Sequence, residues 1–254
     1  MRRYDHGVDA GWVARQATIT QRLVDTSRQT LENQRAEGRL NEPMFDTAVN
    51  YAVERVQDGW ALGEPVKALR ERLGEAAGWA REALDWGMRL DGLEAYRWLE
   101  TALLSGDSAL ALEVAGRIPD EIEELDIQVP VVRDFLVALA RLAERRLDDA
   151  ERLSIAVAEA SSGPRRSLTG VREFAGLGEL VRATAMRDQA GFDDAVGIRT
   201  ASVVSRYDRS EEGRRHRHGL LDLRGASVAA TARALGLRLP AGHTYLATEL
   251  VEAH

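Results

Sequence analysis

Gly106-Asp107-Ser108-Ala109-Leu110 separates two apolar runs with helical spacing, and two later stretches repeat this arrangement. They are Arg146-Leu147-Asp148-Asp149-Ala150 and Gly191-Phe192-Asp193-Asp194-Ala195, which place the alanines of the three copies 41 and 45 residues apart. Weaker copies occur at residues 63–65 and 91–92. Such spacing is typical of one helical hairpin per repeat. The sequence therefore predicts stacked helical hairpins, an architecture that commonly holds another protein.

The composition favours helices along the whole chain. Ala, Leu, Glu and Arg dominate, and β-branched runs bounded by turn residues are nearly absent. We expect an all-α fold of stacked helical hairpins that resembles a short tetratricopeptide-like solenoid. Residues 1–254 are expected to form a single domain, or two continuous lobes over residues 1–160 and 165–254. Ser161-Ser162-Gly163-Pro164 is the strongest loop signal between the two lobes.

Three helices are expected ahead of the hairpins. The second of them has Pro43 in its first turn. The third follows Pro65 and contains Gly74 and Gly78, each of which costs about 1 kcal/mol relative to alanine. We expect a closely packed neighbouring helix to compensate for these two glycines. The first helix covers residues 8–37, and its apolar residues at helical spacing are Trp12, Ile19, Leu23 and Leu31.

Capping residues predict the later helix boundaries. Asp107 or Ser108 can cap the helix that follows Gly106 by accepting its free N–H groups. Pro130 is placed to open a further helix, and Gly236 to end the last long one. The remaining helices are expected over residues 148–160, 171–189, 193–207 and 220–235.

Composition and charge exclude several classes of function. The chain of 254 residues has no cysteine, which removes disulfides, thiolate nucleophiles, iron–sulfur clusters and cysteine-based zinc sites. No stretch approaches the roughly 18 apolar residues of a membrane span, so we expect a soluble cytoplasmic protein. The net charge of −7 argues against nucleic-acid binding and favours basic partners.

One pair of histidines comes nearest to a metal-binding motif. His216 and His218 lie in the stretch Arg214-Arg215-His216-Arg217-His218. The three arginines repel a cation, and no carboxylate stands at a ligand-like spacing. The same stretch could grip a phosphate, but three nearby acidic residues cancel much of its charge. We therefore expect a solvated surface here, with no metal and no cofactor.

Five carboxylates follow Pro119 within seven residues. They are Asp120, Glu121, Glu123, Glu124 and Asp126. The helix dipole favours acidic residues at a helix N-terminus, and the same residues can form a docking patch for a basic partner. Both interpretations can hold together. We take these five residues as the candidate partner-binding site.

Four aromatic residues lie at helical spacings among apolar neighbours. They are Trp79, Trp86, Tyr96 and Trp98. Core packing is the expected role of all four. An exposed aromatic residue that binds a partner is the alternative, because interface hot spots are enriched in Trp and Tyr.

Two stretches of packing residues carry a resemblance to a known family. One joins residues 78–84 (Gly-Trp-Ala-Arg-Glu-Ala-Leu) to residues 98–107 (Trp-Leu-Glu-Thr-Ala-Leu-Leu-Ser-Gly-Asp), and the other runs from Gly219-Leu220-Leu221 through Gly236-Leu237 to Tyr245-Leu246 and Glu249-Leu250. Over its last two thirds the chain resembles the immunity protein 49 family of bacterial polymorphic-toxin systems. The resemblance implies an all-α protein that binds and neutralises a toxin made by the same or a sibling cell. The expected partner is therefore a basic protein toxin.

Two other functions stay open at this point. A scaffold of tetratricopeptide-like hairpins would have the same helices, although spacings of 41 and 45 residues exceed that repeat's 34. A helical enzyme would need a cavity with converging polar groups. The serines lack a Gly-x-Ser-x-Gly setting, and the sequence has no Gly-rich phosphate loop and no His-Glu-x-x-His. We predict no catalytic residue and no enzymatic activity.

Overall fold

The computed structural model describes residues 9–90, 92–119, 129–162, 173–207, 221–241, 243 and 245–252. Every regular element within these ranges is an α-helix. The first five are α1 (Ala10–Glu37), α2 (Glu42–Leu62), α3 (Val66–Asp85), α4 (Gly92–Ser105) and α5 (Ser108–Arg117). The others are α6 (Pro130–Ala143), α7 (Leu147–Ser162), α9 (Leu177–Met186), α10 (Gln189–Tyr207), α12 (Leu223–Ala234) and α13 (Thr248–Glu252).

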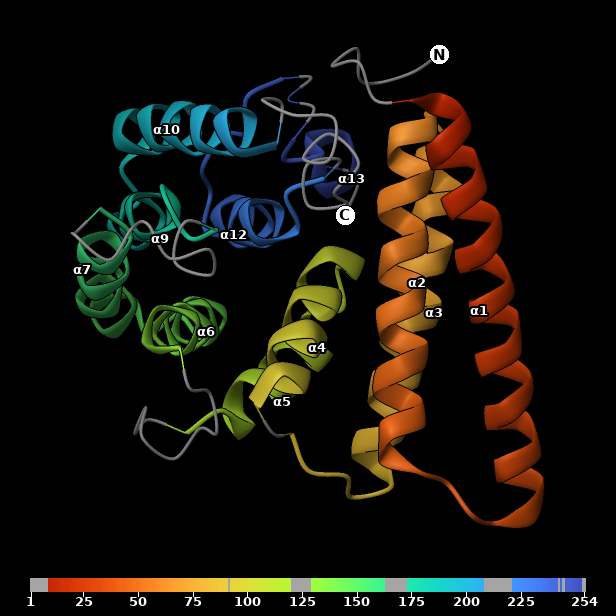
Figure 1. Cartoon of the computed structure of the whole chain (residues 1–254). Helices are drawn as coiled ribbons and strands as arrows, with labels where there is room; N and C mark the ends of the chain where they lie inside the picture. The colour runs from red at the N-terminus through yellow and green to blue at the C-terminus, as the bar shows by residue number, and fades with distance from the viewer. Residues whose placement is uncertain are drawn as a thin grey trace.

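Consecutive helices pack against each other along the chain. Figure 1 shows two groups: α1, α2 and α3 run side by side as long helices, and the shorter helices from α4 onward lie next to them. The predicted all-α fold of stacked helical hairpins is confirmed. No helix in the described ranges has the length and hydropathy needed to span a bilayer.

α1 packs on α2 through a stripe that mixes apolar and polar residues. The hydroxyl of Thr20 lies 2.9 Å from Oδ2 of the buried Asp58 in α2. The expected apolar stripe is wrong at Ile19, which is 49% exposed. Small and polar side chains set the rotation of α1, so hydrophobicity alone does not mark its buried face. The buried residues are Val13, Ala17, Thr20, Val24, Ser27 and Leu31.

The two glycines of α3 face open space. A Cβ added at Gly74 or Gly78 would have no atom of the described residues within 4 Å, so the expected close neighbour is wrong. The close helix contact lies instead at Gly178 of α9, which packs on α7. A Cβ added there would lie 2.5 Å from the backbone nitrogen of Ala158 and 2.7 Å from the carbonyl oxygen of Ser154.

Two of the three predicted breaks coincide with hairpin turns, and the third is displaced. Asp107 caps α5 as predicted, because its Oδ1 accepts the N–H of Leu110 at 3.0 Å. The third turn lies at Arg187 and Asp188 rather than at Gly191, which falls in the first turn of α10. Arg187 takes the left-handed conformation (φ 54°) that glycine usually supplies at a helix end.

α12 fills the centre of the second group of helices. It contacts α4, α6 and α9, all of which precede it in the chain, and Figure 1 shows it lying between α4 and α9. A helix that is buried on all sides has no solvent-facing polar stripe. The core of this group is therefore complete only when α12 is in place. The buried residues of α12 are Leu223, Gly225, Ala226, Ser227, Val228, Ala229, Thr231 and Ala232.

Two arginines hold α13, a helix that the sequence does not predict. Arg70 Nη2 of α3 donates to the carbonyl oxygens of Glu249 and Leu250 at 3.1 and 3.2 Å. Arg233 Nη1 of α12 donates to the carbonyl oxygen of Val251 at 2.7 Å. Carbonyl groups at a helix C-terminus lack partners within the helix, so these cations satisfy them. α13 is thereby tied to both helix groups.

Candidate functional site

The residues singled out for partner binding and metal binding lie outside the part of the chain that the structure describes. This applies to Asp120, Glu121, Glu123, Glu124 and Asp126, and to His216 and His218. Among the described residues, no group of three or more His, Cys, Asp or Glu side chains could hold a metal ion. The predicted docking patch stays a prediction.

The four aromatic residues separate into three buried residues and one exposed residue. Trp79, Tyr96 and Trp98 are buried, as predicted. The prediction is wrong for Trp86, whose residue surface is 55% exposed. α3 ends at Asp85, and the chain turns through Gly87 at a φ of 76°, so Trp86 lies beyond the last residue of the helix. Trp86 is therefore a surface residue and not a core residue.

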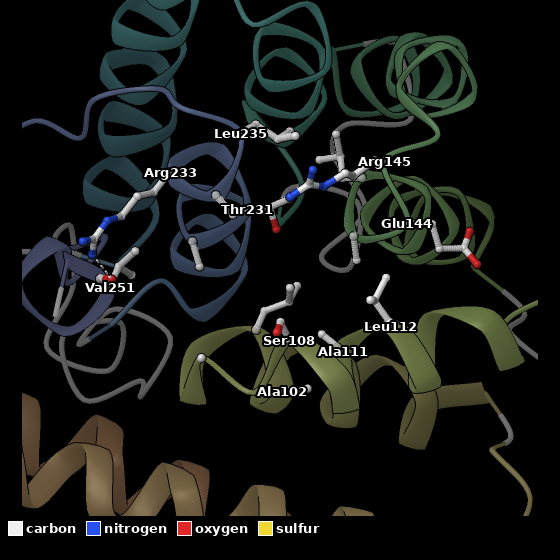
Figure 2. A pocket seen from close by; sticks show the side chains of 16 residues that line it. Ala102, Ser108, Ala111, Leu112, Glu144, Arg145, Thr231, Arg233, Leu235 and Val251 are labelled. Atoms are coloured by element: carbon white, nitrogen blue, oxygen red, sulfur yellow. Dashed lines mark hydrogen bonds between the residues drawn. The ribbon is translucent and has the colours of Figure 1, made fainter. Parts of the chain in front are cut away.

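A pocket of about 640 Å³ opens where several helix ends converge. Its walls come from the α4–α5 turn, the C-terminal end of α6, the C-terminal half of α12, and α13 (Figure 2). Most of the lining is apolar, and Leu112 of α5 is exposed at 52%. Six of the apolar lining residues are Leu103, Ala111, Leu112, Leu142, Leu235 and Val251. We call this cavity the Arg145 pocket.

Arg145 is the charged side chain that enters this pocket. Figure 2 shows it extending from the end of α6 toward Thr231 of α12, whereas Glu144 points away from the cavity. Glu144 is already paired, because its Oε2 accepts a hydrogen bond from Arg141 Nη1 at 2.7 Å. Arg233 also lines the pocket, and it is turned toward the carbonyl oxygen of Val251.

The guanidinium of Arg145 has no ion-pair partner among the described residues. Its neighbours do have partners: Arg141 pairs with Glu144, and Arg146 pairs with Asp149 at 2.7 Å. Arg145 is an exposed residue, so an anion at the mouth of the pocket would meet a positive charge beside an apolar lining. Chemically, this arrangement can bind a negative group and bury the apolar part attached to it.

The backbone of Arg145 is held in an uncommon conformation. Its φ is 62°, in the left-handed region that non-glycine residues rarely adopt. The N–H of Arg145 donates to the carbonyl oxygen of Leu142 at 3.1 Å, and that of Arg146 donates to Arg141 at 2.8 Å. These two bonds close the end of α6. Because Arg145 takes this left-handed conformation just after α6, its side chain turns back toward the pocket (Figure 2).

A buried polar cluster joins α4 to α12. Glu100 is only 6% exposed, and no described residue forms an ion pair with it. Burial raises the pKa of Glu100 to about 7, which the positive charge of Arg224 partly opposes. The Arg224 guanidinium lies over two rings, 5.5 Å from the centre of Tyr96 and 4.8 Å from that of Phe174. This cluster carries an acid that titrates near neutral pH.

The sequence offers only a weak indication of the Arg145 helix end and of the buried Glu100. Gly38, Gly63, Gly87 and Gly236 end their helices with a positive φ, so an arginine in that position is the exception. Glu100 stands four residues after Tyr96, on the buried face of an apolar helix. Neither signal identifies a pocket or a buried acid without the packing of distant helices.

Comparison with protein-family models, with curated proteins and with solved structures finds no match to this chain. The resemblance to an immunity-protein family therefore stays a prediction from the residues quoted above.

Proposed function

We propose that this chain is an immunity protein that binds a basic protein toxin and neutralises it by covering part of its surface. The observation that carries the proposal is the exposure of Trp86. Tryptophan is enriched at interface hot spots, because a large ring buried against a partner contributes strongly to affinity. Trp60 and Trp98 are fully buried in the same fold, so Trp86 stands apart as an indole presented to solvent.

The C-terminal end of α5 contacts the chain two residues after Trp86. Arg117 Nη1 at the end of α5 donates a long hydrogen bond of 3.5 Å to the carbonyl oxygen of Met88. Pro119 follows two residues later, and its carbonyl oxygen accepts a hydrogen bond of 3.0 Å from Arg141 Nη2. The acidic run begins in sequence directly after Pro119. Pro119, the last described residue before this run, thus lies at the same end of α5 that contacts Met88.

The two features support complementary roles in binding. Carboxylates that face a basic toxin raise the association rate more than they lengthen the life of the complex. A central aromatic residue contributes mainly to the strength of the final contact. A stable interface needs roughly 800 Å² on each partner, which paired helices and their connecting turns can present without a deep cavity. No catalytic step is required.

The test begins with the identity of the partner. The full chain is used to capture proteins from its source cell, and each captured candidate is expressed alone in a test host. The proposal predicts that one candidate stops growth and that co-expression of this chain restores it. Restoration by a direct complex, measured with the two purified proteins, separates neutralisation from an indirect effect. Several unrelated non-toxic partners would support the scaffold alternative instead.

Trp86→Ala then tests the surface. Loss of a hot-spot side chain costs about 2 kcal/mol, so the affinity should fall about 30-fold. Met186→Ala is the matched control, because Met186 is 53% exposed at the end of a different helix. Its affinity should match that of the parent. Equal losses in both variants would show that exposed apolar area, rather than the Trp86 surface, drives the association.

Salt dependence tests the acidic patch independently. The double variant Glu123→Lys and Glu124→Lys should associate more slowly at low salt, because reversed charges repel a basic toxin. The difference from the parent should shrink as salt rises. Equal association rates at every salt concentration would remove the patch from the interface and leave Trp86 as the only supported contact.

A further inference from the structure

We propose that the Arg145 pocket binds a small monocarboxylate with an apolar tail. This inference concerns a different feature from the Trp86 surface and does not depend on toxin binding. Pockets that bind small molecules are typically about 300–1,000 Å³, and they pair an apolar lining with a few placed polar groups. A pocket of about 640 Å³ with this type of lining meets both criteria.

The charge of the pocket selects the sign of the ligand. Arg145 enters the cavity without an ion-pair partner among the described residues, and Glu144 is turned outward and bonded to Arg141. Arg233 adds a second cation to the lining while its Nη1 holds the Val251 carbonyl oxygen. A positive site within a chain of net charge −7 is a local departure from the overall charge. An anion gains a charge-assisted hydrogen bond at this point.

The apolar lining selects a ligand with one negative charge and a tail. A carboxylate matches the single free guanidinium and can accept two parallel hydrogen bonds from it. A phosphate monoester carries a second negative charge, whereas the second cation of the lining, Arg233, already donates to the Val251 carbonyl oxygen. The tail would contact Leu103 and Leu142 and the exposed Leu112. Removal of its methylene groups from water would add to the affinity.

Thr231 and Ser108 offer further polar contacts in the same cavity. The Thr231 hydroxyl donates to the carbonyl oxygen of Ser227 at 3.1 Å and keeps its acceptor positions. Ser108 lines the pocket from the first position of α5. Figure 2 shows Arg145, Thr231 and Ser108 disposed around the middle of the cavity. The carboxylate group would lie there, with the tail directed along the apolar lining.

The left-handed backbone of Arg145 provides a matched control for tests of its side chain. A left-handed conformation is unfavourable for a non-glycine residue, and glycine would remove that cost. Arg187 ends α9 in the same way, with a φ of 54°, and it does not line the pocket. Arg145 and Arg187 thus form a matched pair that differs in its relation to the cavity.

The experiment measures binding of dodecanoate to the full chain by isothermal titration calorimetry, below the micelle concentration of the ligand. The parent should bind one dodecanoate, and dodecanol should bind at least tenfold more weakly, because it lacks the charge. Arg145→Gly should weaken dodecanoate at least tenfold, whereas Arg187→Gly should leave it unchanged. Both variants remove an arginine with a left-handed backbone, so they differ mainly in their position relative to the pocket. The thermal unfolding midpoint of Arg145→Gly is measured as well, and an unchanged or higher midpoint shows that the loss of binding does not arise from unfolding.

Three results would overturn the proposal. Absence of saturable binding of dodecanoate to the parent would show that the cavity does not accept this ligand class. Equal affinity for dodecanoate and dodecanol would reduce the site to a purely apolar contact. An equal loss of dodecanoate affinity in Arg145→Gly and Arg187→Gly would show that the net charge of the protein, and not the pocket, determines binding.

Discussion

Arg145 and Arg187 occupy equivalent positions at the ends of α6 and α9, each with a positive φ and each closing its helix with the same pair of backbone hydrogen bonds. The N–H of Arg145 bonds to Leu142, and the N–H of Arg187 bonds to the carbonyl oxygen of Thr184 at 3.1 Å. At four other helix ends a glycine takes this left-handed conformation with the same pair of backbone hydrogen bonds. The two arginines therefore carry a conformational cost that a glycine would not.

The first prediction follows from this equivalence. Arg145→Gly and Arg187→Gly should each raise the free energy of unfolding by about 0.5–1 kcal/mol, since relief of strain exceeds the added entropy of the unfolded chain. Urea titrations of both variants against the parent measure the effect. A lower stability in either variant would mean that its side chain contributes more to the fold than its backbone costs.

The second prediction concerns the glycines of α3 and α9. Gly74→Ala and Gly78→Ala should each stabilise the protein by about 1 kcal/mol, because both positions are helical and have open space around them. Gly178→Ala is the contrasting variant, and it should destabilise by roughly 1–3 kcal/mol through overlap with the α7 backbone. Chemical unfolding of the three variants checks the set. Stabilisation by Gly178→Ala would contradict the close contact between α7 and α9.

The third prediction concerns pH and Glu100. Its folded pKa of about 7 lies above its ordinary value of 4.5, so the folded state holds the proton more strongly than the unfolded state. The contribution of Glu100 to the free energy of unfolding is therefore fully present below pH 4.5. It is lost as the pH rises through 7, and the total loss is about 3 kcal/mol. Glu100→Gln keeps the shape and removes the titration.

Unfolding free energies measured from pH 4.5 to pH 8 test this expectation. The parent and Glu100→Gln should be close in stability at the acidic end, and the variant should be more stable at pH 8. A constant difference between the two proteins across this range would show that Glu100 titrates at its ordinary pKa.

The fourth prediction concerns His243, which ties α10 to the segment before α13. Its Nδ1 accepts the N–H of Leu246 at 3.3 Å, so the proton lies on Nε2, 2.9 Å from the hydroxyl oxygen of Thr200. Burial lowers the pKa of His243 below 6.5. Stability from the neutral ring is therefore present above pH 6.5 and is lost as pH falls.

A nuclear magnetic resonance titration of the ring protons checks this assignment. The midpoint of His243 should lie below 6.5, and the ring should report the Nε2–H tautomer at neutral pH. His243→Gln should remove the part of the acid sensitivity that comes from this residue. A midpoint at or above 6.5 would show that the ring is solvated in the folded protein.

Local chemistry predicted much of the fold, and distant packing decided the rest. Asp107 and Pro130 open the helices that their capping chemistry predicts. Trp86 continues the helical spacing of its neighbours, but it falls one residue past the end of α3, and periodicity does not report where a helix stops. The Arg145 pocket draws its walls from residues as far apart as Ala102 and Val251, a juxtaposition that no local pattern encodes.

The central position of α12 has a consequence for the order of synthesis. Ribosomes deliver α4, α6 and α9 well before α12, so these helices leave the exit tunnel with apolar faces that have no partner yet. α1, α2 and α3 contact one another in sequence order and can fold during translation. The core of the second group is completed only when α12 emerges. A nascent chain stalled before residue 223 should therefore carry a folded N-terminal bundle and an open remainder that chaperones bind.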